Sequence, residues 1–481
     1  MDENDLKHNA VRGVIALTAR TILLQLVSVV ALFFLQIFLE VKDLGVFFIV
    51  TAVFQVFTLF TDVGLGAALI QRKEDIHETD LGTVFVMQEA LVLLAIALGV
   101  LATPVIRAYS GLGSDGIALY YVLLFTLFIS SLKVIPSILL ERKLAFEKQV
   151  LPQIVESLIY NTIVVFLAWK GFALWSYSWA FGISALVGLP IYYFLSPWKI
   201  NFHFAADRAR TLLSFGLFYQ GKSFLAVIKD NLFTFVMSGL VGQTGIGFWG
   251  TAQRWAYFPY RFVVDSVTKV TFPAYSRAQN NASVLRAGIE RSLFTVSLLL
   301  FPLYAVMAVN IHSLVLLIPK YTKWEPAIIS FYFLCSQAII AALTNILVNV
   351  LDATGRVKTT LCLMVVWIIG TWGLALFLIT KLGFTGISVA QFLVSLTIII
   401  VVILVRRFVP FDFWGNVGRP LTAAAVATVA MLVTVNILPV SYLSVLATAA
   451  AGSIIYVLAI WLIAADKIKT TAKLVISAYR K

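Results

Sequence analysis

Residues 359–379 read TTLCLMVVWIIGTWGLALFLI, a stretch of 21 residues that contains no charged side chain. An α-helix needs about 20 apolar residues to cross the ~30 Å hydrocarbon core of a bilayer, whereas a barrel strand needs about 9–11. In lipid, each spanning segment must also satisfy its own backbone hydrogen bonds, which favours a helix. The stretch therefore predicts a transmembrane helix.

Segments of the same kind fill most of the chain on both sides of this stretch. The 481 residues are 61% hydrophobic and 12% charged, with a mean hydropathy of +0.96, whereas a soluble domain carries about 25% charged residues. We predict an all-α polytopic membrane protein of about 14 transmembrane helices, with little chain left for a soluble domain. The predicted segments are 13–39, 44–70, 81–106, 117–140, 150–169, 172–195, 212–240, 245–266, 292–317, 327–350, 359–379, 384–405, 420–438 and 442–464.

The distribution of Lys and Arg predicts how these helices are oriented. With both termini in the cytoplasm, the cytoplasmic segments hold 24 of the 36 basic residues and the external loops hold six. The positive-inside rule describes this bias. We therefore expect a multi-pass protein of the bacterial inner membrane with cytoplasmic N- and C-termini. The net charge of +13 then reflects topology, and nucleic acid is not an expected partner.

An internal repeat predicts how the helices are grouped. At an offset of 200 residues, Leu32, Phe33, Gly45, Phe48, Thr51 and Ala52 recur as Leu232, Phe233, Gly245, Phe248, Thr251 and Ala252. Gly171-Phe172 before the sixth helix is matched by Gly383-Phe384 before the twelfth. An even number of helices separates the copies, so they run parallel, as in transporters with two halves related about the membrane normal. We predict a six-helix half in 1–211, a second in 212–406 around a central cavity, and two extra helices with a basic cytoplasmic tail in 407–481.

Two patterns that suggest other chemistry are set aside. Residues 216–223, GLFYQGKS, match the phosphate-loop pattern, but they lie inside a predicted span and lack the strand, loop and helix that nucleotide binding requires. The four histidines and two cysteines have neither metal-ligand nor disulfide spacing. We expect no metal and no cofactor.

Ionisable side chains inside the predicted spans are the candidate functional residues, because a charge in the hydrocarbon core is costly. Arg20, Lys133 and Glu156 lie within about two turns of the predicted cytoplasmic helix ends, from where long side chains can reach the surface. For these three a structural role is also expected. The deeper set, expected near the midplane, is Lys229, Asp230 and Arg261.

The spacing of the cations indicates two stripes on consecutive helices. Lys222 and Lys229 are seven residues apart, as are Arg254 and Arg261, so each pair shares one helix face. Such stripes must face an aqueous cavity or an ion-pair partner, and their groups suit phosphate. Pairing of Arg261 with Asp265, or of Lys229 with Asp230 or Asp265, is the alternative. The residues predicted to bind substrate are Arg20, Lys222, Lys229, Arg254 and Arg261, and the aromatic residues on which sugars can stack are Tyr219, Trp249, Trp255, Tyr257 and Tyr260.

Carboxyls inside the spans offer a route for ion coupling. A buried carboxyl without a partner favours its protonated form, so Asp62 or Glu89 could carry a proton. Pairing with Arg20 or Lys222 is the alternative explanation. The candidates for ion coupling are Asp62, Glu89, Asp230 and Asp265.

Four stretches resemble signatures of bacterial polysaccharide exporters. DVGLGAALIQRK at 62–73 ends the second predicted helix, and LERKLAFEKQ at 140–149 precedes the fifth. FGLFYQG at 215–221 opens the seventh, and FPAYSR at 272–277 follows the eighth. Together they are similar to the Wzx-type oligosaccharide flippases of the multidrug/oligosaccharidyl-lipid/polysaccharide (MOP) superfamily, near the colanic acid and teichuronic acid exporters.

The resemblance implies two helical bundles around a cavity lined partly by the first, second, seventh and eighth helices. It implies a substrate of undecaprenyl pyrophosphate carrying an oligosaccharide repeat unit, moved by alternating access that can be ion-coupled. Membrane lipids, a polysaccharide polymerase and a chain-length regulator are the implied partners.

Two other functions remain open at this point. A drug or cation antiporter of the same superfamily usually has an acidic cavity, whereas here paired cations dominate. A membrane glycosyltransferase or polymerase would need catalytic acids and a large external loop, and the longest external loop is short, at 107–116. We therefore predict a transporter and not an enzyme.

Overall fold

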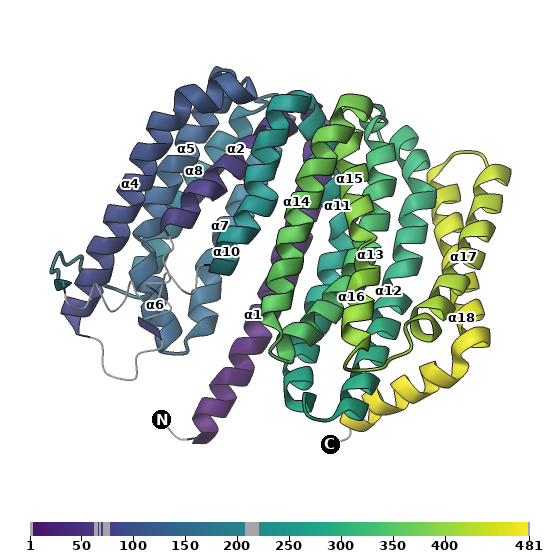
Figure 1. Ribbon diagram of the computed structural model, residues 1–481. Helices are drawn as coiled ribbons and strands as arrows, with labels where there is room; N and C mark the ends of the chain where they lie inside the picture. Colours follow the sequence, from purple (N-terminus) through teal and green to yellow (C-terminus); the bar gives the residue numbers. More distant parts are fainter. Residues whose placement is uncertain (1–2, 62–65, 67–68, 71–76, 207–220, 480–481) are drawn as a thin grey trace. The chain divides into compact units, whose positions relative to one another are not determined.

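The computed structural model describes residues 3–61, 66, 69–70, 77–206 and 221–479. All regular secondary structure in these residues is helical, and no strand occurs among them (Figure 1). Each helix keeps its backbone hydrogen bonds within itself, as lipid surroundings require. The predicted all-α fold is confirmed.

Contacts between helices divide the chain into two compact units, residues 1–247 and 248–481. The boundary falls inside one helix, α11 (Phe233–Ala278). The division at 211 and 406, which rests on the sequence repeat, stays a prediction. The other helices of the first unit are α1 (Glu3–Phe38), α2 (Val41–Thr61), α4 (Glu78–Ser110), α5 (Ser114–Ser131), α6 (Val134–Arg142), α7 (Phe146–Trp169), α8 (Trp175–Leu195), α10 (Gly221–Val227) and the π-helix η1 (Ile228–Leu232).

The second unit continues from α11 and carries the remaining helices. Two of them begin at a side-chain cap, which satisfies a backbone N–H group that the first turn leaves open. Asn281 accepts from the N–H of Val284 at 3.2 Å, and Asp412 accepts from that of Gly415 at 2.9 Å. The helices are α12 (Ala282–Leu317), the short 3-10 helix η2 (Thr322–Trp324), α13 (Ala327–Ala353), α14 (Val357–Leu382), α15 (Thr385–Ser395), α16 (Ile398–Arg406), α17 (Phe413–Ile437) and α18 (Tyr442–Tyr479).

Twelve segments of the described chain are long and apolar enough to cross a membrane. One of them, Phe224–Ala278, is 55 residues long and bends at Gly242, whose backbone is not helical (φ 72°, ψ 176°). It therefore supplies two spans, which correspond to the seventh and eighth predicted helices. A shorter apolar helix, Leu23–Phe38, corresponds to the first. The prediction of about 14 transmembrane helices is thus confirmed.

Glycine brings two repeat-related segments of the first unit into backbone contact. A Cβ on Gly45 of α2 would overlap the carbonyl oxygen of Gln243, and a Cβ on Gly247 would overlap that of Val41. Because the Gly45 segment recurs at Gly245, the start of α2 packs on its own repeat copy. Only a residue without a side chain permits such an approach.

The bend in α11 is also held against the end of α4. The side-chain amide of Gln243 donates hydrogen bonds to the carbonyl oxygens of Ser110 (3.2 Å) and Gly111 (2.7 Å). The Tyr109 hydroxyl donates to the carbonyl oxygen of Val236 (2.9 Å). These bonds satisfy carbonyls that a helix end and a bend leave open, so the bend has fixed partners.

Both copies of the repeated Gly-Phe pair turn the chain between helices. Gly171 follows α7 with φ 88°, and Gly383 follows α14 with φ 58°. A positive φ costs glycine little, which explains the residue at both turns. After the second turn, a Cβ on Gly386 would lie 2.6 Å from the carbonyl oxygen of Leu378, so α14 and α15 pack closely.

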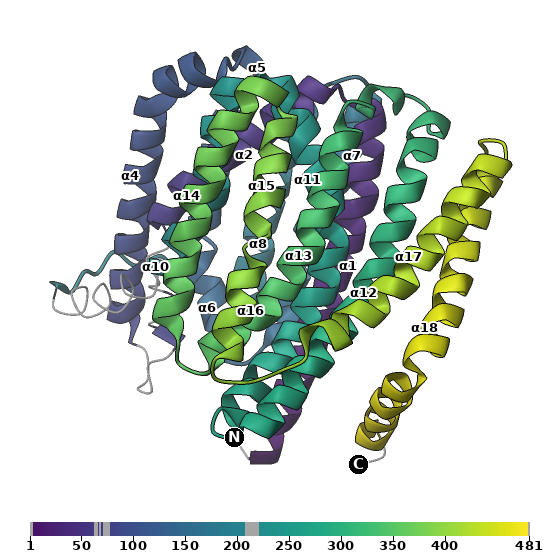
Figure 2. The ribbon, with the colours of Figure 1, turned by 45° about the vertical axis from the view of Figure 1, so that its right-hand side comes forward.

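The last two helices, α17 and α18, lie side by side (Figure 2). Helix α18 has a break at Ala464 (φ −139°), and the residues after the break are tied to α17. The Arg419 guanidinium donates to both carboxylate oxygens of Asp466 at 3.1 Å, and Lys467 donates to the Asn416 amide oxygen at 2.6 Å. The beginning of the basic C-terminal part of α18 is therefore held against α17 by these hydrogen bonds.

Gly247→Ala should destabilise the protein by about 1–3 kcal/mol, because the new Cβ meets backbone and one helix must move. Gly373→Ala on α14 is the matched control, since no atom lies within 4 Å of its Cβ, and it should leave stability unchanged or slightly raised. Thermal unfolding of the detergent-purified chain measures both. Equal unfolding temperatures for the two variants would contradict the backbone contact.

Candidate functional site

Two charges predicted to lie inside spans form a buried ion pair in the first unit. The Lys133 ammonium, between α5 and α6, lies 2.7 Å from the Glu156 carboxylate on α7. Their side chains are 9% and 26% exposed. A Cβ on Gly188 of α8 would overlap the Glu156 carboxyl, so this glycine makes room for the pair. Lys133 and Glu156 were expected to reach the membrane surface with their long side chains. In the structure they pair with each other instead.

Arg20 of α1 belongs to the same unit as this ion pair. Its side chain is half-buried, and its Nε atom is buried without a hydrogen-bond partner in the described chain. Tyr192 of α8 interacts electrostatically with both Arg20 and Glu156. Arg20 and Glu156 therefore have a common neighbour in Tyr192.

Glu89 of α4 is a second buried acid of the first unit. Both of its carboxylate oxygens are buried without a hydrogen-bond partner in the described chain. Its polar neighbours are Ser131 and Tyr193, but the Ser131 hydroxyl donates to the Phe128 carbonyl (2.7 Å) and Tyr193 donates to the Leu132 carbonyl (3.2 Å). The polar groups beside the Glu89 carboxyl are therefore hydroxyls, and these carry no charge.

Lys229 and Asp230 lie in the π-helix η1. The Lys229 ammonium is 3.5 Å from an Asp230 carboxylate oxygen, and the two side chains are 45% and 65% exposed. The predicted pairing of these neighbours is therefore present, but the pair stays open to its surroundings. Lys229 lies 13 residues before Gly242, or about 20 Å along a helix, and its expected position near the midplane stays a prediction. Single π-turns often mark functional sites.

Arg254, Arg261 and Asp265 lie on one face of α11 in the second unit, and all three side chains are exposed. Asp265 interacts electrostatically with Arg261 and with Lys269, each four residues away along the helix. The face is therefore a stripe of alternating charge with a cationic majority. Arg254 and Arg261 share one helix face, as their spacing predicts, because the backbone of α11 keeps helical dihedral angles from the residue after Gly242 to its end.

Counting along α11 gives the distance of each cation from the bend. Arg254 lies 12 residues after Gly242 and Arg261 lies 19 after it, about 18 Å and 28 Å along the helix. Helix α11 runs on to Ala278, past the predicted end at 266. The expected midplane position of Arg261 stays a prediction.

Polar side chains of α13 hold the aromatic residues of α11. The Tyr257 hydroxyl donates to the amide oxygen of Gln337 at 2.8 Å, and the rings of Tyr257 and Tyr260 lie 5.4 Å apart. Tyr260 also hydrogen-bonds to Asn345, which accepts at 2.8 Å from the amide of Asn349. The two tyrosines therefore stand in fixed orientations beside the charged face.

The sequence interpretation missed the amides of α13. Gln337, Asn345 and Asn349 are spaced by eight and four residues, so they share one face of an apolar helix, and that spacing is the signal that could have found them. Of the predicted tryptophans, Trp249 is buried in the packing and Trp255 is half-buried.

Several predicted positions lie outside the described residues. They are Asp62, Tyr219 and the side chain of Lys222, with most of the phosphate-loop match. Within the described residues, no group of three or more His, Cys, Asp or Glu could hold a metal ion. Cys335 is buried and Cys362 is exposed, and both are free thiols.

Comparison with known proteins identifies relatives of this arrangement. A family model described as "Polysaccharide biosynthesis protein" matches residues 34–329. The chain is 24% identical over 268 residues to the succinoglycan biosynthesis transport protein ExoT of Rhizobium meliloti (strain 1021), covering 55% of this chain and 53% of ExoT. It is 24% identical over 348 residues to the teichuronic acid biosynthesis protein TuaB of Bacillus subtilis (strain 168), covering 69% and 70%. The chain thus spans about half the length of the first of these relatives.

Solved structures share the fold of the chain. The lipid II flippase MurJ in an inward closed conformation matches with a TM-score of 0.75 at 14% identity, over 95% of this chain and 100% of that one. An inward-facing multidrug resistance MATE transporter of the MOP superfamily matches with a TM-score of 0.62 at 15% identity, over 82% and 97%. The comparisons confirm the resemblance to polysaccharide biosynthesis proteins that the motifs indicate, and the solved structures share the predicted multi-pass helical fold.

Removing one partner of the buried ion pair should destabilise the protein. Lys133→Met leaves the Glu156 carboxylate buried without its partner, at a cost of about 3 kcal/mol. The double variant Lys133→Met, Glu156→Met should recover most of that loss, because no unpaired charge remains. Thermal unfolding measures both, and a double variant no more stable than the single one would show that the pair is not the source of the effect.

Proposed function

The chain belongs to the polysaccharide biosynthesis protein family, and on this premise we propose that it flips undecaprenyl-pyrophosphate-linked oligosaccharide repeat units across the bacterial inner membrane. The repeat units would serve the synthesis of an exopolysaccharide of the colanic acid type. The named relatives export or assemble succinoglycan and teichuronic acid, which are also polysaccharides.

The observation that carries the proposal is the exposed cationic face of α11. Arg254 and Arg261 lie on an apolar spanning helix, and neither is covered by the unit that contains it. Exposure of a guanidinium to lipid is costly, so a face on which arginines outnumber the one aspartate favours water or an anionic ligand beside it. A guanidinium binds phosphate oxygens through two parallel hydrogen bonds, which suits a pyrophosphate.

The aromatic residues beside this face suit the glycan part of the cargo. Tyr257 and Tyr260 are fixed by Gln337 and Asn345, so their rings can receive a sugar without losing side-chain entropy. Sugar rings stack on such faces, and their hydroxyls can bond to the α13 amides. The arginines thus bind the pyrophosphate, and the tyrosines and the α13 amides bind the sugars.

The charges of the first unit have separate roles in the proposal. Lys229, together with Lys222, attracts the diphosphate, while Asp230 holds the Lys229 ammonium between transport events. Arg20 shares the neighbour Tyr192 with Glu156, and because the Lys133–Glu156 pair is already neutral, Arg20 adds a positive charge that attracts the anionic cargo. Glu89 carries the coupling proton, with Asp62 and Asp265 as further carboxyls for the coupling ion.

Transport by alternating access completes the proposal. The positive-inside bias favours cytoplasmic N- and C-termini, so the repeat unit is collected at the inner leaflet, where its synthesis takes place. A polysaccharide polymerase and a chain-length regulator would receive it on the other side.

A drug or cation antiporter is the second candidate. The fold of the MATE transporter supports it, because that protein is named for multidrug resistance. The charge on α11 opposes it, since two arginines against one aspartate disfavour a cationic drug.

Arg254→Gln should reduce flipping at least tenfold, because a charge-assisted contact to the pyrophosphate is lost. The measurement uses purified protein in liposomes with a lipid-pyrophosphate oligosaccharide in one leaflet and an impermeant glycosidase that reports the fraction that has crossed. Lys381→Gln, an exposed cation at the end of α14, is the matched control and should flip at the wild-type rate. Arg254→Lys should retain part of the activity.

Wild-type flipping by Arg254→Gln and by the Arg254→Gln, Arg261→Gln double variant would exclude the cationic face as the pyrophosphate site. Efflux of a cationic dye without crossing of any lipid-linked glycan would favour the antiporter.

Glu89→Gln should remove the response of flipping to a proton gradient while leaving the rate without a gradient within about twofold. The glutamine side chain has nearly the size of the glutamate side chain, but it does not take up a proton at the pH values of the assay. The same liposomes, prepared with and without a pH step, measure the ratio. An equal loss of rate under both conditions would assign Glu89 to packing rather than to coupling.

A further inference from the structure

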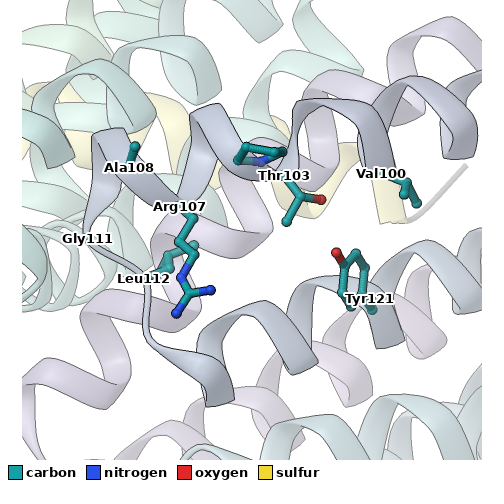
Figure 3. A pocket seen from close by; sticks show the side chains of 8 residues that line it. Val100, Thr103, Arg107, Ala108, Gly111, Leu112 and Tyr121 are labelled. Carbon is teal, nitrogen blue, oxygen red and sulfur yellow. The ribbon is translucent and has the colours of Figure 1, made fainter.

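An open pocket lies in the first unit, at the end of α4 and the beginning of α5 (Figure 3). It is separate from the charged groups assigned above. Its walls come from one face of α4, from the turn that follows, and from α5. The lining residues are Val100, Thr103, Pro104, Arg107, Ala108, Gly111, Leu112 and Tyr121.

Arg107 supplies the charge of this pocket. Its side chain is exposed, and Figure 3 shows the guanidinium reaching from α4 into the space beside α5. It forms neither an ion pair nor a hydrogen bond in the described chain, although Asp115 lies in the first turn of α5. The pocket thus offers a guanidinium with all of its donors available, which is the group that proteins use to bind a phosphate diester.

Two further polar groups lie around the guanidinium. Tyr121 of α5 is 43% exposed, and its hydroxyl points toward α4 in Figure 3. Pro104 has no N–H to donate to the Val100 carbonyl one turn earlier, so that oxygen remains an available acceptor. The charged group of an anion can therefore accept hydrogen bonds from Arg107, and a hydroxyl group of the same molecule can donate one to the Val100 carbonyl oxygen.

The outer face of α4 next to the pocket is apolar. Val100, Leu101 and Val105 are 46%, 74% and 68% exposed, and Leu94 and Leu98 continue the same surface along the helix. A spanning helix presents such side chains to acyl chains. A phosphate site and an acyl-chain surface thus adjoin at one helix end, and the ligand with both parts is a phospholipid.

We propose that this pocket binds the headgroup of an anionic phospholipid, with the phosphate on Arg107, the headgroup hydroxyls on Tyr121 and the Val100 carbonyl, and an acyl chain along α4. Phosphatidylglycerol has this chemistry. The lipid fills the gap between α4 and α5 beside the turn that Gln243 anchors. The site does not depend on the transport function proposed above.

Native mass spectrometry of the delipidated full chain, titrated with phosphatidylglycerol, tests the site. Arg107→Gln should weaken the tightest binding step about tenfold, and Ala108→Phe should weaken it similarly by filling the pocket. Lys170→Gln is the matched control, because Lys170 is an exposed cation that lies over the Trp169 ring (4.3 Å) and does not line the pocket. It should bind as the wild type does.

Wild-type affinity in both pocket variants would overturn the proposal. Equal binding of phosphatidylcholine would show that the anionic charge is not recognised, and competition by soluble glycerol phosphate at similar concentration would make the pocket a free phosphate site. If Arg107→Gln does not fold, two other variants test the site. Ala108→Phe fills the pocket, and Arg107→Lys keeps the charge but loses the bidentate contact. Both should bind phosphatidylglycerol more weakly than the wild type, and wild-type affinity in both would overturn the proposal.

Discussion

A charged side chain at membrane depth must meet an opposite charge or water, because lipid offers neither. The described chain satisfies this constraint in two ways. Lys133 and Glu156 pair with each other at 2.7 Å inside the first unit, where Gly188 leaves space for them. Arg254 and Arg261 instead stay exposed on α11, where Asp265 interacts with Arg261 and leaves the face with a cationic majority. The Lys133–Glu156 pair stabilises the helix packing of the first unit, whereas the exposed arginines of α11 form a surface that suits an anion.

The positions of the charges follow from how the backbone is interrupted. In the first unit, the π-helix at Ile228–Leu232 sets Lys229 and Asp230 side by side. At Gly242 the helix bends, and the count of residues after the bend sets the distance of Arg254 from it along the helix. Glycine contacts at Gly45 and Gly247 then hold the bend against α2. Irregular backbone and functional charge thus occur together, as is common where a helix lines a cavity.

The sequence predicted the spans well, because each apolar run of about 20 residues has one solution in lipid. It also predicted that Arg254 and Arg261 share a face, which spacing alone decides. It could not pair Lys133 with Glu156, since 23 residues and a change of helix separate them. The predicted span at 245–266 ends before α11 does, because hydropathy falls at the lipid boundary whereas the helix continues to Ala278. The amides of α13 were missed because they carry no charge, and their common face becomes apparent only from their spacing of eight and four residues.

The π-turn at Ile228–Leu232 also bears on how this chain tolerates changes in length. A π-turn holds one residue more than an α-turn, and it arises when a residue is inserted into an existing helix. Loss of one residue here would restore a regular α-helix instead of breaking one. Because the extra residue is absorbed within the π-turn, its loss would leave the helix on either side in its present orientation, and Phe233 and Met237 would keep the packing in which they are buried. The same loss from a regular stretch of α11 would instead turn the residues that follow by about 100° about the helix axis. Natural variation in length by one residue should therefore be tolerated better at this turn than elsewhere in the helix.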